Sequence, residues 1–210
     1  MSNTALLIMD IQNCIVSSFA ASELIDHLQL AAASARKASI PIIYVVVKFR
    51  HGYPEVSSNN KTFSALTAGT FHLVENDPAT DIEASLAPQP GDIIVTKRRV
   101  SAFSGSDLEV VLRSQDISHL VLAGIATSGV VLSTLRLAAD MDYEITVLSD
   151  CCCDRDDEVH KVLMEKVFPR QAEVITSQQW AEQLSEPLDE ERKEDKADEA
   201  DDAAYDYASH

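Results

Sequence analysis

The chain has 210 residues, of which 46% are hydrophobic, and a formal net charge of −17. This length is enough for one domain with a sizeable hydrophobic core. The acidic balance argues against nucleic acid and anionic membrane surfaces as partners, because both repel a negatively charged protein. The sequence has no apolar run of about 18 residues and no signal-peptide pattern at its start, so we expect no membrane partner and a cytoplasmic location.

Acidic residues are concentrated at the C-terminal end, where residues 186–210 carry −8 of the net charge. This stretch has too few apolar residues to form a core, so we expect one folded domain at 1–185 and a disordered acidic tail at 186–210. Three of the four cysteines are adjacent, at Cys151, Cys152 and Cys153. Adjacent cysteines do not form a disulfide framework, and we expect reduced thiols.

Strand-like and helix-like patterns alternate along the chain. Apolar, β-branched runs predict strands at 4–11, 40–49, 92–98, 119–126, 144–151 and 172–177. Helical spacing predicts helices at 21–39, 106–115, 128–141 and 156–168, followed by a short helix at 177–184. Ser106 and Glu109 have the spacing of a capping box for the second of these helices. Because several strands are apolar on both faces, we expect an α/β protein whose parallel sheet is covered on both sides.

Residues 50–91 interrupt this alternation with four prolines and three glycines. A connection of this length within one domain is usually functional or disordered. It follows the second predicted strand at the edge where ligands bind in such sheets, so we interpret it as a lid. A surface excursion without a role is the alternative.

Three polar features follow predicted strands at this same carboxyl edge. Asp10 ends the first apolar run, Lys97 ends the third, and "GIATSGV" at 124–130 follows the fourth. Ligands of open parallel sheets bind beyond the carboxyl ends of the strands, so these residues are candidates for one site. A buried ion pair that only fixes two strand ends is the alternative for Asp10 and Lys97.

Three sequence stretches resemble the isochorismatase-like, or cysteine hydrolase, family over residues 4–178: "LLIMDIQN", "VTKRRVSAF" and "GIATSGVVLSTLRLAADMDY". The resemblance implies a three-layer α/β fold with a six-stranded parallel sheet of order 3-2-1-4-5-6 and helices on both faces. It also implies a homo-oligomer, a small-molecule substrate and no cofactor. Asp10 and Lys97 match two catalytic residues of the family's amidases.

The family's nucleophilic cysteine falls, by the same resemblance, on Val130, which suggests a subgroup without that cysteine. A valine side chain cannot form a covalent intermediate. The resemblance also implies a cis peptide between Ile125 and Ala126, in a turn with Thr127 whose amides at 126 and 130 face a substrate oxygen. Such amides persist whatever side chain stands at 130.

Further residues are candidates for a nucleophile, for substrate binding or for metal binding. Ser128 and Ser133 point away from the direction of residue 130 on a helix, and Cys14 or Cys151–Cys153 are more typical of buried structural thiols. Arg50, Arg98 and Arg99 suit a substrate carboxylate, and Phe103 and Ser128 are further candidates for substrate contact. His51 alone makes no metal site, and the remaining histidines lack ligand spacing, so we expect no metal.

Three functions remain open from the sequence. The first is a hydrolase that acts on a small carboxylate-bearing molecule by acid catalysis, with Asp10 as the acid and no covalent intermediate. The second is a catalytically silent family member that binds a small acid or a protein. The third is an amidase with a relocated nucleophile.

Overall fold

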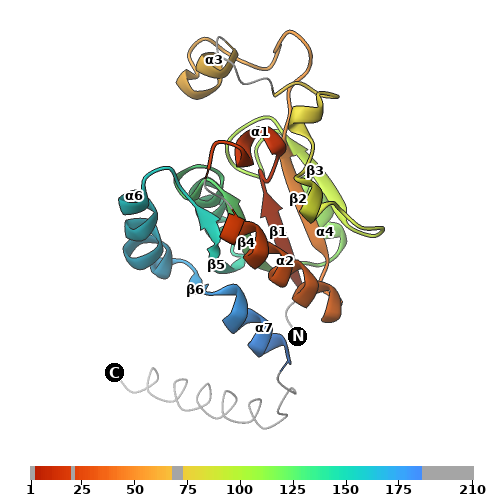
Figure 1. The fold of residues 1–210 in the computed structure, drawn as a ribbon, viewed down its shortest axis with the longest axis vertical. Helices are drawn as coiled ribbons and strands as arrows, with labels where there is room; N and C mark the ends of the chain where they lie inside the picture. The colour runs from red at the N-terminus through yellow and green to blue at the C-terminus, as the bar shows by residue number, and fades with distance from the viewer. Residues whose placement is uncertain (1–2, 20–21, 68–72, 186–210) are drawn as a thin grey trace, which may run out of the picture.

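The structure is a computed structural model that describes residues 3–19, 22–67 and 73–185. Its strands are β1 (Thr4–Met9), β2 (Ile42–Val47), β3 (Ile93–Lys97), β4 (His119–Ile125), β5 (Glu144–Cys153) and β6 (Glu173–Ile175). They form one six-stranded parallel sheet of order β3-β2-β1-β4-β5-β6, shown in Figure 1. The predicted fold class and strand order are therefore confirmed.

Helices cover both faces of this sheet. The α-helices of the described residues, among which α3 lies beyond the edge of the sheet, are α1 (Asn13–Val16), α2 (Ser22–Lys37), α3 (Lys61–Thr67), α4 (Leu108–Ser114), α5 (Leu132–Asp140), α6 (Asp157–Val162) and α7 (Ser177–Ser185). Short 3₁₀ and π turns add η1 (Pro78–Thr80), η2 (Ala84–Leu86), η3 (Thr127–Val131), η4 (Leu163–Val167) and η5 (Phe168–Arg170). The core on one face contains residues of α2 and α7, and the core on the other contains residues of α4, α5 and η4.

The central strand β1 explains why its sequence is apolar without alternation. Leu7 and Met9 pack into the core under α4 and α5, whereas Leu6 and Ile8 pack into the core under α2. Successive side chains of a strand point to opposite faces, so a strand buried on both sides needs apolar residues throughout. Asp10 is the first residue beyond this run.

Two predicted helix starts differ from the structure. The capping box at Ser106 and Glu109 is only half formed: the Ser106 hydroxyl accepts from the Leu108 amide at 3.3 Å and donates to the carbonyl of Ala102 at 2.6 Å, whereas Glu109 pairs with Arg113 and Asp107 directly precedes α4. The helix predicted at 128–141 opens with the π turn η3, inside which Gly129 has non-helical backbone angles. Regular helix therefore begins only at Leu132.

Strand β5 is longer than predicted and is bulged against β4. Leu122 pairs with Val147, and Gly124 pairs with Cys152, so β5 advances by five residues where β4 advances by two. The extra residues form a β-bulge, a feature that bends a strand and changes the direction of the chain after it. As a result β5 ends at Cys153, and residues 154 and 155 lie at the carboxyl edge of the sheet.

The first part of the segment between β2 and β3 lies beyond that edge, where α3 stands above the tips of the strands (Figure 1). Its later part returns beside α2 to the start of β3, with Leu86 in the core under α2 and Asp92 paired with Arg36. A small core of Val47, Phe49, Phe63 and Leu73 joins the first part to β2. Residues 68–72 of this segment, and the predicted tail at 186–210, lie outside the described residues. The closing motion of a lid stays a prediction. Across the described part of the chain, no helix is long and apolar enough to cross a membrane.

Candidate active site

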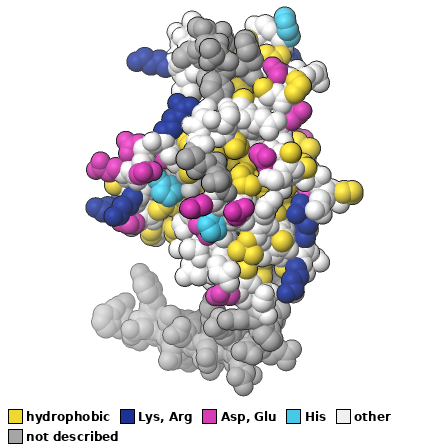
Figure 2. All heavy atoms as spheres, in the orientation of Figure 1, with side chains coloured by type: hydrophobic (Ala, Val, Ile, Leu, Met, Phe, Trp, Pro, Cys, Tyr) yellow, Lys and Arg dark blue, Asp and Glu magenta, His cyan; other side chains and the backbone are white. Residues whose placement is uncertain are grey.

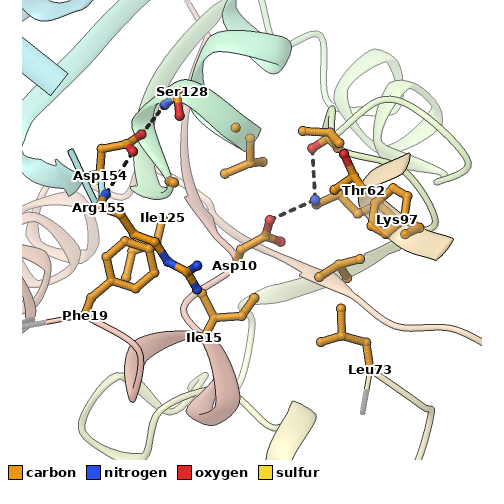
Figure 3. Close-up of a pocket in the computed structure, with 16 residues that line it drawn as sticks. Asp10, Ile15, Phe19, Thr62, Leu73, Lys97, Ile125, Ser128, Asp154 and Arg155 are labelled. Atoms are coloured by element: carbon orange, nitrogen blue, oxygen red, sulfur yellow. Dashed lines mark hydrogen bonds and ion pairs between the residues drawn. The ribbon is translucent and has the colours of Figure 1, made fainter. Parts of the chain in front are cut away.

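A cavity of about 460 Å³ opens at the carboxyl edge of the sheet, which is a usual size for a small-molecule site. Its charged lining comes from Asp10, Lys97, Asp154 and Arg155, drawn in Figure 3. Its apolar wall includes Ile15, Phe19, Val47, Phe63, Leu73 and Val130. Strands β1, β3, β4 and β5 thus deliver groups to one space, as expected for a parallel sheet.

Lys97 holds Asp10 in place and has no donor left for a ligand. The Lys97 ammonium donates to Asp10 Oδ2 at 2.8 Å, to the carbonyl of Arg99 at 3.0 Å and to the carbonyl of Val100 at 2.9 Å. An ammonium has three donors, so these three bonds use all of them. Lys97 is 1% exposed, which makes the ion pair a buried one. The group of this pair that can act on a ligand is therefore Asp10.

The second carboxylate oxygen of Asp10 is buried and has no hydrogen-bond partner among the residues that the structure describes. Asp10 is 6% exposed, and burial raises the pKa of its carboxyl although the neighbouring Lys97 opposes that shift. Because Oδ2 accepts from Lys97, Oδ1 is the oxygen left to carry a proton. A buried polar atom without a partner is costly unless a ligand or water meets it. Figure 3 shows the carboxyl group facing the cavity.

The turn after β4 lies next to Asp10 because Gly124 allows the close approach. A Cβ at Gly124 would collide with the carbonyl oxygen and side chain of Met9. The peptide between Ile125 and Ala126 is cis, as the family resemblance implies. Val130 is 2% exposed and forms part of the cavity wall.

Three amides of this turn have partners within the protein. The Ser128 amide donates to Asp154 Oδ2 at 2.7 Å, and those of Gly129 and Val131 donate to the carbonyl of Ala126. Ala126 and Val130, the two residues whose amides are predicted to face a substrate oxygen, both line the cavity. Ser128 lines it as well.

A histidine that sequence patterns did not single out anchors the turn from α6. His160 Nδ1 lies 2.7 Å from the buried hydroxyl of Thr127. Burial lowers the pKa of His160, although Asp154 and Asp157 oppose this. The neutral imidazole is thus favoured beside the turn.

Four residues predicted for substrate contact, Arg50, Arg98, Arg99 and Phe103, lie away from the cavity lining. Arg99 donates to the carbonyls of Arg98 and Glu55. Arg50 pairs with Glu55. Arg98 pairs with Glu55 and Glu75 and donates to the Lys48 carbonyl, which fixes the segment between β2 and β3. Phe103 packs against the core, with its ring centroid 6.0 Å from that of Tyr143.

The cavity instead receives Asp154 and Arg155, which sequence reasoning missed. The Asp154 carboxylate accepts from the Ser128 amide and from the Arg155 amide at 2.8 Å. Partial burial raises the pKa of Asp154, but these hydrogen bonds outweigh it and the pKa lies below its usual value. Both residues directly follow a strand at the edge where ligands bind, which would have marked them as candidates. The predicted strand ended at residue 151, two residues before the observed end of β5, so this position was not recognised.

None of the cysteines lines the cavity. Cys151 and Cys152 are buried, and burial raises the pKa of all four thiols, that of Cys152 to about 12 and that of Cys153 to about 11. A thiol of raised pKa is a poor nucleophile at neutral pH because little thiolate is present. Within the described ranges no three His, Cys, Asp or Glu side chains are grouped to hold a metal ion.

The parallel sheet brings Asp10, Lys97 and a strand-to-helix turn to one cavity, which is where open α/β proteins bind their ligands. Residues 4–179 match the isochorismatase domain, and the chain belongs to the isochorismatase family. It is 31% identical to the isochorismatase family protein YwoC of Bacillus subtilis over 86% of this chain and 94% of that one. It is 32% identical to the ureidoacrylate amidohydrolase RutB of Pantoea ananatis, over 70% and 68% of the two chains.

Solved structures agree with this assignment of the fold. A cysteine hydrolase from Pseudomonas syringae pv. phaseolicola superposes with a TM-score of 0.80 at 22% identity, covering 87% of this chain and 92% of that one. An N-carbamoylsarcosine amidase from Thermoplasma acidophilum gives a TM-score of 0.71 at 22% identity, covering 90% of this chain and all of the other.

Proposed function

We propose that this protein hydrolyses a small carboxylate-bearing molecule by acid catalysis from Asp10, without a covalent enzyme intermediate. The observation that carries the proposal is the buried, unpartnered Asp10 Oδ1 at the cavity, in a carboxyl whose pKa is raised by burial. A carboxyl of raised pKa keeps its proton at higher pH than an ordinary aspartic acid, as a general acid requires. The family membership and the hydrolase names of several relatives support the reaction class.

The reaction that fits this site is the hydrolysis of an enol ether or a similar electron-rich double bond. Asp10 Oδ1 gives its proton to the terminal carbon of the double bond, and the neighbouring oxygen then shares the positive charge as an oxocarbenium ion. Water adds to the cationic carbon and returns one proton to the Asp10 carboxylate. The resulting hemiketal breaks down to a ketone and an alcohol. Lys97 holds Oδ2 throughout and so keeps Oδ1 directed at the substrate.

This scheme needs no side-chain nucleophile, which agrees with the identity of residue 130. Val130 offers no lone pair, and the cavity lining contains no thiol in its place. The amides of Ala126 and Val130 are proposed to bind a carbonyl or carboxylate oxygen of the substrate and so to orient the double bond toward Asp10. N–H donors suit an oxygen that carries negative charge, so they are not assigned to the ether oxygen that becomes cationic.

The lack of a nucleophilic group at Val130 also favours one other function, that of a family member which binds its ligand without converting it. Both functions need the cavity, and only the first needs the acid. An amidase with a relocated nucleophile is less consistent with the site, because Cys151 and Cys152 are buried thiols of raised pKa.

The Asp10→Asn variant tests the proposal. A panel of enol ethers, ureido acids and amides is first screened by thermal shift and by turnover with the wild-type protein. For a substrate found there, we expect turnover to fall about 10²- to 10⁴-fold in Asp10→Asn, because the general acid is lost. Binding should change far less, since asparagine has almost the same shape.

A matched control is Asp140→Asn, which makes the same change at an exposed residue of α5 outside the cavity lining. If Asp10 served only as the partner of Lys97, its replacement would leave a buried cation unpaired. The variant would then lose about 3–5 kcal/mol of stability and keep near-normal turnover once folded. That pair of results would contradict the acid role.

A further inference from the structure

Arg155 places an unneutralised cation at the cavity. Its guanidinium carbon lies 5.5 Å from the centroid of the Phe19 ring, and both residues line the cavity. Across the residues that the structure describes, the guanidinium has neither an ion pair within 4.0 Å nor a hydrogen bond. Figure 3 shows it extending over Phe19 from the end of β5, toward the side of the cavity where Asp10 lies.

The neighbouring charges leave this guanidinium available. Asp154, the adjacent carboxylate, directs its two oxygens to the amides of Ser128 and Arg155 rather than to the guanidinium. Lys97 is occupied by Asp10 and two carbonyls. Arg50 and Arg98 are paired with glutamates outside the cavity. Among the cationic side chains considered for a substrate carboxylate, Arg155 alone combines a place in the cavity with freedom from an acidic partner.

We propose that Arg155, held over the face of Phe19, is the carboxylate anchor that determines substrate specificity. This assignment extends the proposed function, and it rests on that function for which end of the ligand reacts at Asp10. A planar guanidinium binds a carboxylate through two parallel hydrogen bonds, and stacking on an aromatic ring reduces the freedom that such binding removes. Arg155 is thus assigned a binding role, and Asp10 the chemical one.

The geometry also selects the kind of ligand. The carboxylate lies at Arg155, the reacting group lies at Asp10 Oδ1, and an apolar body contacts walls that include Val130 and Phe63. Arg155 supplies one positive charge, and the anionic Asp154 lies beside it. The site therefore suits a ligand that carries a single negative charge. Acidic side chains also gather over α6, which begins with Asp157 and Glu158 two residues beyond Arg155 (Figure 2). Doubly charged phosphates and dicarboxylates should therefore bind less well than monocarboxylates.

Binding to the full chain tests this without any need for turnover. The probes are crotonate, hexanoate and benzoate, each compared with its uncharged primary amide, and phenyl phosphate as the doubly charged comparison. We expect the wild type to prefer each carboxylate to its amide and to phenyl phosphate. In Arg155→Gln the affinity for the carboxylates should fall about ten- to a hundredfold, as for loss of a charge-assisted hydrogen bond, while the amides bind as before.

Matched variants identify the cause of any loss. Arg113→Gln removes an exposed arginine of α4 that is outside the cavity lining, and should bind carboxylates like the wild type. Arg155→Lys keeps the charge but not the paired donors, and Phe19→Leu removes the supporting ring. Each should lose part of the carboxylate preference, by less than Arg155→Gln.

The outcomes separate the anchor from the proposed reaction. Unchanged carboxylate affinity in Arg155→Gln, or no preference for carboxylates in the wild type, would overturn the anchor whatever the activity of Asp10→Asn. Conversely, carboxylate binding that depends on Arg155 in a protein without turnover would support the anchor and reject the reaction. Equal losses in Arg155→Gln and Arg113→Gln would indicate a general effect of net charge and overturn the anchor.

Discussion

At the scale of single residues, the site combines a buried carboxyl, Asp10, with an apolar side chain, Val130, at the position that the family resemblance assigns to the nucleophile. Asp10 keeps its supporting lysine, its burial and an oxygen free to meet a ligand. Val130 adds only apolar surface to the same cavity. The two observations together favour chemistry in which the enzyme transfers a proton and water supplies the attacking oxygen.

The Val130→Cys variant examines the space that the valine occupies. A thiol at 130 would line the cavity, whereas burial raises the pKa of Cys152 to about 12 and of Cys153 to about 11. We expect iodoacetamide to modify residue 130 faster than Cys151, Cys152 or Cys153, as followed by peptide mass spectrometry. We also expect weak amidase activity on simple amides in the variant and none in the wild type.

The Lys97→Ala background supplies the control for this experiment. Amidase activity of the wild type that persists in Lys97→Ala would mean that the hydrolytic site lies elsewhere. Modification of residue 130 no faster than that of the native cysteines would show that the cavity does not expose this position to solvent.

At the scale of elements, α6 supports the turn after β4 through one hydrogen bond between His160 and Thr127. The turn itself includes η3, in which the amides of Gly129 and Val131 donate to the carbonyl of Ala126, while Ser128, Gly129 and Val130 line the cavity. Burial keeps the pKa of His160 below its usual value, so its imidazole binds a proton less readily in the folded protein than in the unfolded chain. Burial of this imidazole therefore links the stability of the folded domain to pH.

The sign of this linkage can be tested with His160→Gln. As pH falls below about 6.5, the unfolded state binds more protons than the folded state at this residue, so the free energy of unfolding decreases. We expect the wild type to lose more melting temperature than His160→Gln between pH 8 and pH 5.5. His51→Gln, at an exposed loop residue, should behave like the wild type. An identical loss in the wild type and His160→Gln would contradict the linkage.

The elements also show what the sequence could predict. The strands were predictable because β1, β2 and β4 are buried on both faces and must be apolar throughout. Asp10, Lys97 and the turn at 124–130 were found because parallel strands bring their carboxyl ends together. Asp154 and Arg155 were missed because the bulge in β5 arises from pairing with β4, which local periodicity does not report.

At the scale of the whole molecule, the described domain closes with α7, where Trp180 packs into the core against α2. Residues 186–210 are strongly acidic and poor in apolar residues. We propose, on the basis of this composition, that they are dispensable for folding. We also propose that the domain forms a homo-oligomer, as the family resemblance implies.

A chain truncated after Ser185 tests both proposals at once. Its melting temperature should match that of the full chain, because little apolar surface is removed. A fall of more than about 4 °C, equivalent to roughly 1 kcal/mol for a chain of this size, would show that the removed residues stabilise the domain. Light scattering of the same truncated protein should give a multiple of the monomer mass, and a monomeric value would reject the oligomer.

The bulge in β5 has a consequence for how this site can change. Asp10 and Lys97 come from β1 and β3, whereas Arg155 comes from the end of β5, whose extra residues between Val147 and Cys152 set where that end lies. Insertion or deletion of a residue within 148–151 would move the guanidinium and leave the acid–lysine pair untouched. Insertions or deletions in β5 would therefore change, during evolution, the length of the ligand that the site accepts. The reacting groups on β1 and β3 would keep their positions.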